Sequence, residues 1–139
     1  MLFAWLKKIL APEPAPYEGE LKTGQIWQYR TRDCEPDSKL HIFLTDDDEK
    51  LGKIFHIRVE GLNLASAPNV KMFPHAPIVE KKLRQSVTEL VGDNQNVPDS
   101  SVKAYLAWNV TRYVGDSGIF SIMVSEIAAQ IEKAMAGKK

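Results

Sequence analysis

Three runs of alternating apolar and polar residues between Gly24 and Leu64 constrain the fold more than any other part of the chain. The runs span 26–32, 40–45 and 54–60, and their large apolar residues recur at every second position. This period is typical of half-buried β-strands. The segments between the runs, 33–39 and 46–52, are rich in aspartate and contain proline, serine or glycine, which favour turns. We therefore expect three neighbouring strands joined by turns.

A pairing register follows if the apolar faces of the three strands coincide. Trp27 and Tyr29 then lie beside Leu44 and Ile42, and Phe55 lies beside Ile42. In this register His41 sits directly across from His56. The opposite, polar face of the sheet collects Gln28, Arg30, Arg32, His41, Phe43, Thr45, His56, Arg58 and Glu60.

The second half of the chain has helical periodicity. A short edge strand is expected at 70–73, then helices over 78–91, from Asp99 or Ser100 onward, and from about 119 to 136. The apolar residues assigned to these helices include Leu83, Val87, Leu90, Val102, Tyr105, Leu106, Trp108, Phe120, Ile127 and Ile131. Strands followed by helices indicate an α+β domain. We expect an antiparallel sheet of three to four strands, with the three helices packing on its apolar face.

The first sixteen residues are expected to precede a single domain at 17–139. Residues 1–10 fit a short amphipathic helix, and the alternating prolines of 11–16 favour an extended linker. The helix is too short to span a membrane, and its lysines follow the apolar run, which argues against a secretory signal. It is expected to pack on the domain or on a partner; the alternative is contact with a membrane surface through Leu2, Trp5 and Leu6.

Composition limits the classes of function. The chain has 139 residues with 18 basic and 18 acidic side chains, so no nucleic-acid partner is expected. Cys34 is the single cysteine, which excludes an internal disulfide and favours the reducing cytoplasm. The chain contains no P-loop, dinucleotide fingerprint, HExxH or CxxC motif. Gly115–Gly118 copies the sequence around a serine-protease nucleophile, but Ile119 follows it, and we interpret Asp116 or Ser117 as a helix N-cap.

The three histidines are the candidates for chemistry. If His41 and His56 are neighbours, they could bind a divalent metal or act as an acid–base pair on a phosphoester, with an arginine holding the phosphate. His75 could join them if its loop folds back. Histidine and arginine are also ordinary residues on a partner-facing sheet surface, and we favour recognition. The predicted binding residues are Arg30, Arg32, His41, His56, Arg58 and His75; no catalytic residue, metal ligand or cofactor is predicted.

The stretch Gly24–Arg32, followed by Glu35, Ser38, His56, Gly61, His75 and Pro77, resembles small bacterial proteins of uncharacterised function. The resemblance implies a small binding protein of the immunity or antitoxin kind, by analogy. We therefore expect a non-enzymatic bacterial protein-interaction domain in the cytoplasm, such as an immunity or inhibitor protein. The alternatives are a small metal- or His-dependent hydrolase acting on phosphoesters and a peripheral membrane adaptor.

Overall fold

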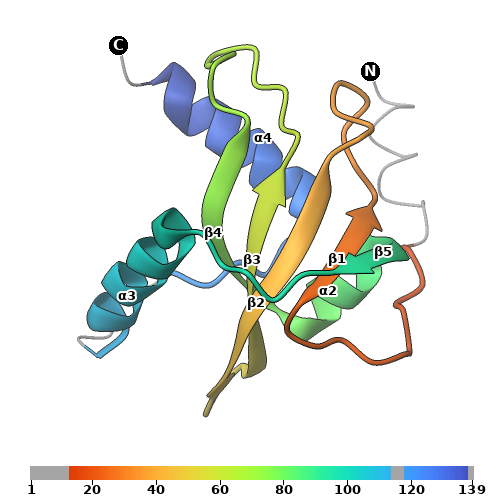
Figure 1. Cartoon of the computed structure of the whole chain (residues 1–139), viewed down its shortest axis with the longest axis vertical. Helices are drawn as coiled ribbons and strands as arrows, with labels where there is room; N and C mark the ends of the chain where they lie inside the picture. The colour runs from red at the N-terminus through yellow and green to blue at the C-terminus, as the bar shows by residue number, and fades with distance from the viewer. Residues whose placement is uncertain (1–12, 114–117, 138–139) are drawn as a thin grey trace, which may run out of the picture.

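The computed structural model describes residues 13–113 and 118–137. Its elements, in chain order, are β1 (Gln25–Tyr29), β2 (Lys39–Asp48), β3 (Gly52–Glu60), β4 (Met72–Val79), α2 (Glu80–Ser86), β5 (Val87–Asp93), α3 (Asp99–Tyr113) and α4 (Val124–Ala136). The strands form one antiparallel sheet in the order β4-β3-β2-β1-β5 (Figure 1). The α+β class is confirmed, with five strands where three to four were expected. In the described ranges, no helix is long and apolar enough to cross a membrane.

The predicted register is wrong, although the predicted strands are present. Ile42 pairs with Ile57 and Trp27 pairs with Leu40, so His41 faces Arg58 and not His56. A shift of two or four residues leaves every side chain on the same face of a strand. Alternation therefore identifies the face of each residue without fixing the offset between strands.

A β-bulge in β2, between Ile42 and Leu44, changes the face of the residues that follow it. Leu44 pairs with His56, and Asp46 pairs with Ile54. Since directly paired residues share a face, Leu44 and Asp46 lie on the polar face. Leu44 was predicted to share the core face with Ile42, and Asp46 was predicted to lie in a turn. The strand continues through Asp48, which brings the acidic residues into the sheet.

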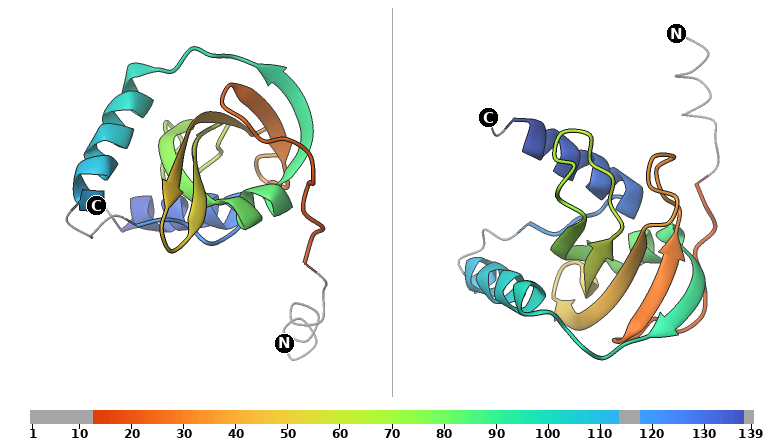
Figure 2. Two further views of the ribbon diagram at one scale, coloured as in Figure 1. Left: turned by 90° about the horizontal axis from the view of Figure 1, so that it is seen from below. Right: turned by 45° about the horizontal axis from the view of Figure 1, so that its top comes forward.

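The hydrophobic core lies on the face of the sheet that carries Trp27, Ile42 and Ile57, and it includes Leu83 from α2 and Ile127 from α4. The sheet is strongly curved, with α2 and α4 along one side, while the connection from β5 to α3 arches over the other side (Figure 2). Every α2 and α4 residue assigned to the core cluster is fully or almost fully buried.

The helix α3 lies against the polar face, which corrects the expectation that all three helices pack on the apolar face. The rings of Tyr105 and Trp108 lie 4.8 and 4.9 Å from the ring of His56, between centroids. The apolar residues of α3 fall on two different sides of the helix. Trp108 faces inward, whereas Leu106 is 54% exposed.

The helix predicted for 78–91 ends at Ser86, and the next seven residues form β5. Val87, Leu90 and Val91 have helical spacing, but the segment is also rich in β-branched residues, which favour strands. Pairing with β1 decides between the two states, since Leu90 lies beside Trp27. The last helix begins at Val124 and not at 119, because Phe120 instead exchanges backbone hydrogen bonds with β4.

Two predictions concern residues outside the described ranges: the helix at 1–10 and the N-cap at Asp116 or Ser117. The end of the proline-rich segment is held on the domain. Glu13 contacts Lys82 and Gln85 of α2, and the backbone amide of Tyr17 donates to the carbonyl of Arg84.

Candidate functional site

The six residues predicted as one binding surface occupy three different environments. Arg30 is exposed, and its Nε donates to the Gln85 carbonyl. Arg32, in the connection between β1 and β2, belongs to an ion-pair network with Glu35 and Glu132. The remaining four side chains are buried on the polar face, with 8% exposure for His41, 0% for His56, 4% for Arg58 and 8% for His75. This face is covered, so it offers a partner little of their surface.

His56 lies at the centre of a hydrogen-bonded chain that we call the histidine network, formed by Asp46, His56, His75 and Tyr105. His56 Nε2 lies 2.9 Å from Asp46 Oδ2, and His56 Nδ1 lies 2.8 Å from His75 Nε2. A carboxylate accepts, so His56 donates from Nε2 and accepts at Nδ1. His75 therefore donates from Nε2, and its Nδ1 carries the lone pair. His75, which was expected to join the other histidines only if its loop folded back, lies beside His56.

Side chains of α3 contact the histidine network on the polar face of the sheet. The Tyr105 hydroxyl donates to Asp46 Oδ2 at 3.0 Å, and Arg112 Nη1 lies 3.6 Å from the same oxygen. The Trp108 ring lies edge-to-face with both histidines, and its indole NH donates to the Gly118 carbonyl. Arg112 also lies over the Trp108 ring, 5.4 Å from its centroid. The Asp46 carboxylate is thus contacted by polar side chains from both β3 and α3.

Burial keeps both histidines of the network neutral. Burial, followed by the neighbouring His56, lowers the pKa of His75 to about 4. Burial also lowers the pKa of His56, against the opposing effect of the hydrogen bond that His56 donates to Asp46. A neutral imidazole has one donor and one acceptor, which is the pattern that the two hydrogen bonds of His56 require.

His41 belongs to a separate group on the same face. Arg58 Nη2 donates to His41 Nδ1 at 3.0 Å, which leaves His41 Nε2 to donate to Glu60 at 3.1 Å. Arg58 Nε also donates to Glu60. Burial, followed by the charge of Arg58, lowers the pKa of His41. His41 and His56 therefore have different hydrogen-bond partners and do not form the predicted pair.

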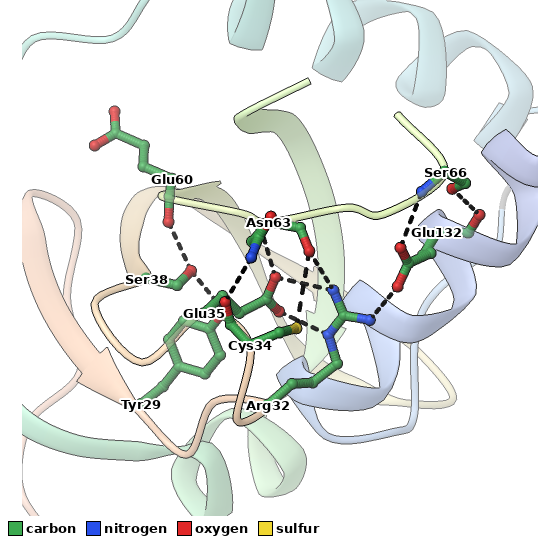
Figure 3. Close-up of polar contacts among 9 residues, drawn as sticks. All are labelled: Tyr29, Arg32, Cys34, Glu35, Ser38, Glu60, Asn63, Ser66 and Glu132. Carbon is green, nitrogen blue, oxygen red and sulfur yellow. Dashed lines mark hydrogen bonds and ion pairs between the residues drawn. The ribbon is translucent and has the colours of Figure 1, made fainter. Parts of the chain in front are cut away.

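Arg32 joins three parts of the chain (Figure 3). It donates two hydrogen bonds to Glu35, at 2.8 and 2.9 Å, and one to Glu132 of α4 at 2.7 Å. Glu35 also accepts from the backbone amide of Asn63, and Glu132 accepts from that of Ser66. The two carboxylates thus hold the β1–β2 and β3–β4 connections to α4. We therefore assign Arg32 a structural role, in which it joins these connections to α4.

The outer side of α3 carries a row of exposed apolar residues. Val102, Leu106 and Val110 are 42%, 54% and 67% exposed. Their spacing of four residues places them along one side of the helix. They are flanked by the exposed Lys103 and the half-buried Asn109. We call these three residues the α3 row.

Sequence reasoning missed Asp46 as a site residue and counted Val102, Tyr105, Leu106 and Trp108 among the apolar residues of a helix packed on the apolar face. The extent of β2 and its bulge bring Asp46 to His56, and neither is encoded in a recognisable motif. The signal for α3 was present, since its apolar residues cover too many directions for a helix with one buried side.

Among residues 13–113 and 118–137, no group of three or more His, Cys, Asp or Glu side chains has an arrangement that could hold a metal ion. Comparisons with protein-family models, with curated proteins and with solved structures found no match to this chain.

Proposed function

We propose that the chain is a non-enzymatic protein-interaction domain that binds its partner through the α3 row. The observation that carries the proposal is the exposure of Val102, Leu106 and Val110 on one side of a helix whose other side is occupied. The proposed interaction surface is therefore the outer side of α3, and not the polar sheet face that α3 covers.

The geometry favours a partner with an apolar groove. Anchors at i, i+4 and i+8 on a convex helix are the pattern of helix-in-groove recognition. Full burial of a Val or Leu side chain contributes roughly 1.5–3 kcal/mol, and each side chain of the row has about half of its surface left to bury. The row can therefore contribute about 3 kcal/mol, the size of a small cluster of interface anchors.

The proposal includes the immunity or inhibitor class and a cytoplasmic location. Proteins of that class act by occupying a partner without chemistry, which a docking helix provides. Cys34 is free and exposed, as suits a reducing compartment.

Capture from native lysate tests the proposal. The bait is the full chain, compared with Leu106→Glu and with the matched control Leu90→Glu, which places the same charge at a similarly exposed leucine on β5. We expect a stoichiometric partner that binds the unchanged chain and the control, with binding to Leu106→Glu weakened more than about tenfold. No stoichiometric partner, or a partner unaffected by Leu106→Glu, would contradict the proposal.

A His-dependent hydrolase acting on phosphoesters is the second candidate. The observation that favours it is the chain Asp46–His56–His75, in which a carboxylate orients one imidazole and that imidazole orients the next. His75 Nδ1, at the end of the chain, would be the general base. Its low pKa makes it a weak base at neutral pH, which places this candidate second. Hydrolysis of an activated phosphodiester that is lost in His75→Gln would support the hydrolase; equal rates would reject it.

A further inference from the structure

We propose that the histidine network is an acid-sensitive latch: proton uptake by His56 and His75 releases α3 from the sheet while the rest of the domain stays folded. This inference concerns the inner side of α3 and does not depend on the α3 row binding a partner.

The attachment of α3 to the sheet depends on the histidine network. On its inner side, Tyr105 bonds to Asp46, Trp108 packs on both imidazoles, and Arg112 approaches Asp46 and donates to the Asp47 carbonyl at 2.7 Å. Ser101, in the first turn, is fully buried, and its hydroxyl has no hydrogen-bond partner among the described residues. Among the described side chains, the inner side of α3 thus packs the rings of Tyr105 and Trp108 on the two imidazoles and adds the polar contacts of Tyr105 and Arg112.

The hydrophobic core does not require α3. Among the described residues, the core cluster draws on the strands, on α2 and on α4, and it includes no residue of α3. The connection from β5 reaches α3 across the outside of the sheet (Figures 1 and 2). The helix can therefore separate from the sheet without opening the core, as a unit of lower local stability.

Burial opposes a proton on either ring, and for His56 it outweighs the charge of Asp46, which favours one. The charged and titratable groups around the pair are Asp46 from β2, the two histidines themselves from β3 and β4, and Tyr105 and Arg112 from α3; Asp48 lies 4.0 Å from Arg112. Asp46 already accepts from His56 and Tyr105 and lies beside Arg112. The other ring contacts of His75 are the aromatic side chains of Phe43, Tyr105 and Trp108. A proton on His56 would therefore create a cation buried near the Arg112 charge, and a proton on His75 would create one buried among aromatic rings.

Protonation also disrupts the hydrogen bonds. Once both rings carry a second proton, His56 Nδ1 and His75 Nε2 are both donors, so the 2.8 Å hydrogen bond between them is lost. Release of α3 would expose both rings to water, where each binds a proton without these costs. Proton uptake and release of the helix are thus linked.

The direction of the pH dependence of helix release follows from the direction of the two pKa shifts. Burial lowers the pKa of His75 to about 4 and also lowers that of His56, whereas exposed histidine titrates near 6.5. The neutral rings therefore favour the closed helix above about pH 6.5, and this stabilisation is lost as the pH falls toward 4. For His75 alone, the equilibrium constant for release rises about twentyfold from pH 7 to pH 5.

Hydrogen exchange of the full chain tests the latch, with protection factors corrected for the intrinsic pH dependence of exchange. We expect amides of α3 to lose about twentyfold or more in protection between pH 7 and pH 5, while amides of α4 keep theirs. His75→Gln, whose amide can still donate to His56, should reduce this pH dependence. The matched control is His41→Gln, a buried histidine that is hydrogen-bonded to Arg58 and Glu60 and lies outside the histidine network, which should retain it.

Three outcomes would overturn the latch. Protection of α3 could be independent of pH, α3 and α4 could lose protection together, or His75→Gln could retain the full pH dependence. None of these results bears on capture through Leu106, so the latch and the proposed function can fail separately.

Discussion

Replacement of Glu35 by glutamine should destabilise the fold far more than the same change at Glu132, although both carboxylates bind Arg32. The Glu35 side chain is completely buried and accepts two hydrogen bonds from Arg32 and one from the backbone of Asn63. The Glu132 side chain is partly exposed on α4. The comparison separates a fully buried carboxylate partner from a partly exposed one at a single arginine.

The loss in the free energy of unfolding depends on the Arg32 charge, which Glu35→Gln leaves without its buried partner. Removing one partner of a buried ion pair costs roughly 3–5 kcal/mol, because a buried charge loses its partner. Arg32 is 19% exposed and keeps Glu132, so we take the lower end of this range, about 3 kcal/mol. With a typical urea dependence of about 2 kcal/mol per molar, the midpoint of Glu35→Gln should fall by about 1.5 M.

Urea unfolding of the unchanged chain, Glu35→Gln and Glu132→Gln, followed by circular dichroism, measures these midpoints. We expect the shift for Glu132→Gln to be well under half of that for Glu35→Gln, because exposed ion pairs contribute little. Equal shifts, or no shift for Glu35→Gln, would refute the assignment of Arg32 to a buried structural network.

Three further substitutions test other parts of the structure. Ser101→Ala should stabilise the chain by about 1 kcal/mol in urea unfolding, because it removes a buried hydroxyl without a partner; a loss of stability would contradict this. Gly24→Ala should lower the thermal midpoint more than Gly52→Ala. Both glycines have positive φ, 99° and 77°, but a Cβ at Gly24 would meet the side chains of Asp93 and Gln95, whereas the space at Gly52 is open; the reverse order would refute the steric argument. Leu106→Glu should change the free energy of unfolding by less than about 0.5 kcal/mol, since the side chain is on the surface, and a larger loss would mean that the α3 row is packed within the domain.

The sequence was sufficient for the parts of the fold that depend on local periodicity. Alternation located β2 and β3 and placed Trp27 and Tyr29 in the core, where they are 2% and 5% exposed. Helical spacing identified Leu83 and Ile127, which are fully buried. These predictions succeed because each needs only the face of a residue within its own strand or helix.

The predictions that failed depend on contacts between distant segments. The offset between β2 and β3, the bulge at Phe43 and the pairing of 87–93 with β1 are decided by how whole elements fit together. These errors in strand pairing also affected the prediction of the candidate site. The predicted pair of His41 and His56 does not form, and His75 was expected near His56 only on a condition. Asp46 was missed because it reaches His56 through the bulge and through the extension of β2.

The central claim is that α3 rests on a neutral histidine pair and presents its other side to a partner. A two-dimensional proton–nitrogen NMR spectrum of the imidazole groups at neutral pH, with contacts to Trp108 measured in the same sample, tests it directly. We expect His56 and His75 to carry their protons on Nε2, to show contacts to the Trp108 ring, and to titrate below the usual 6.5, with the pKa of His75 at about 4. Histidines that titrate near pH 6.5, without contacts to Trp108, would contradict the account.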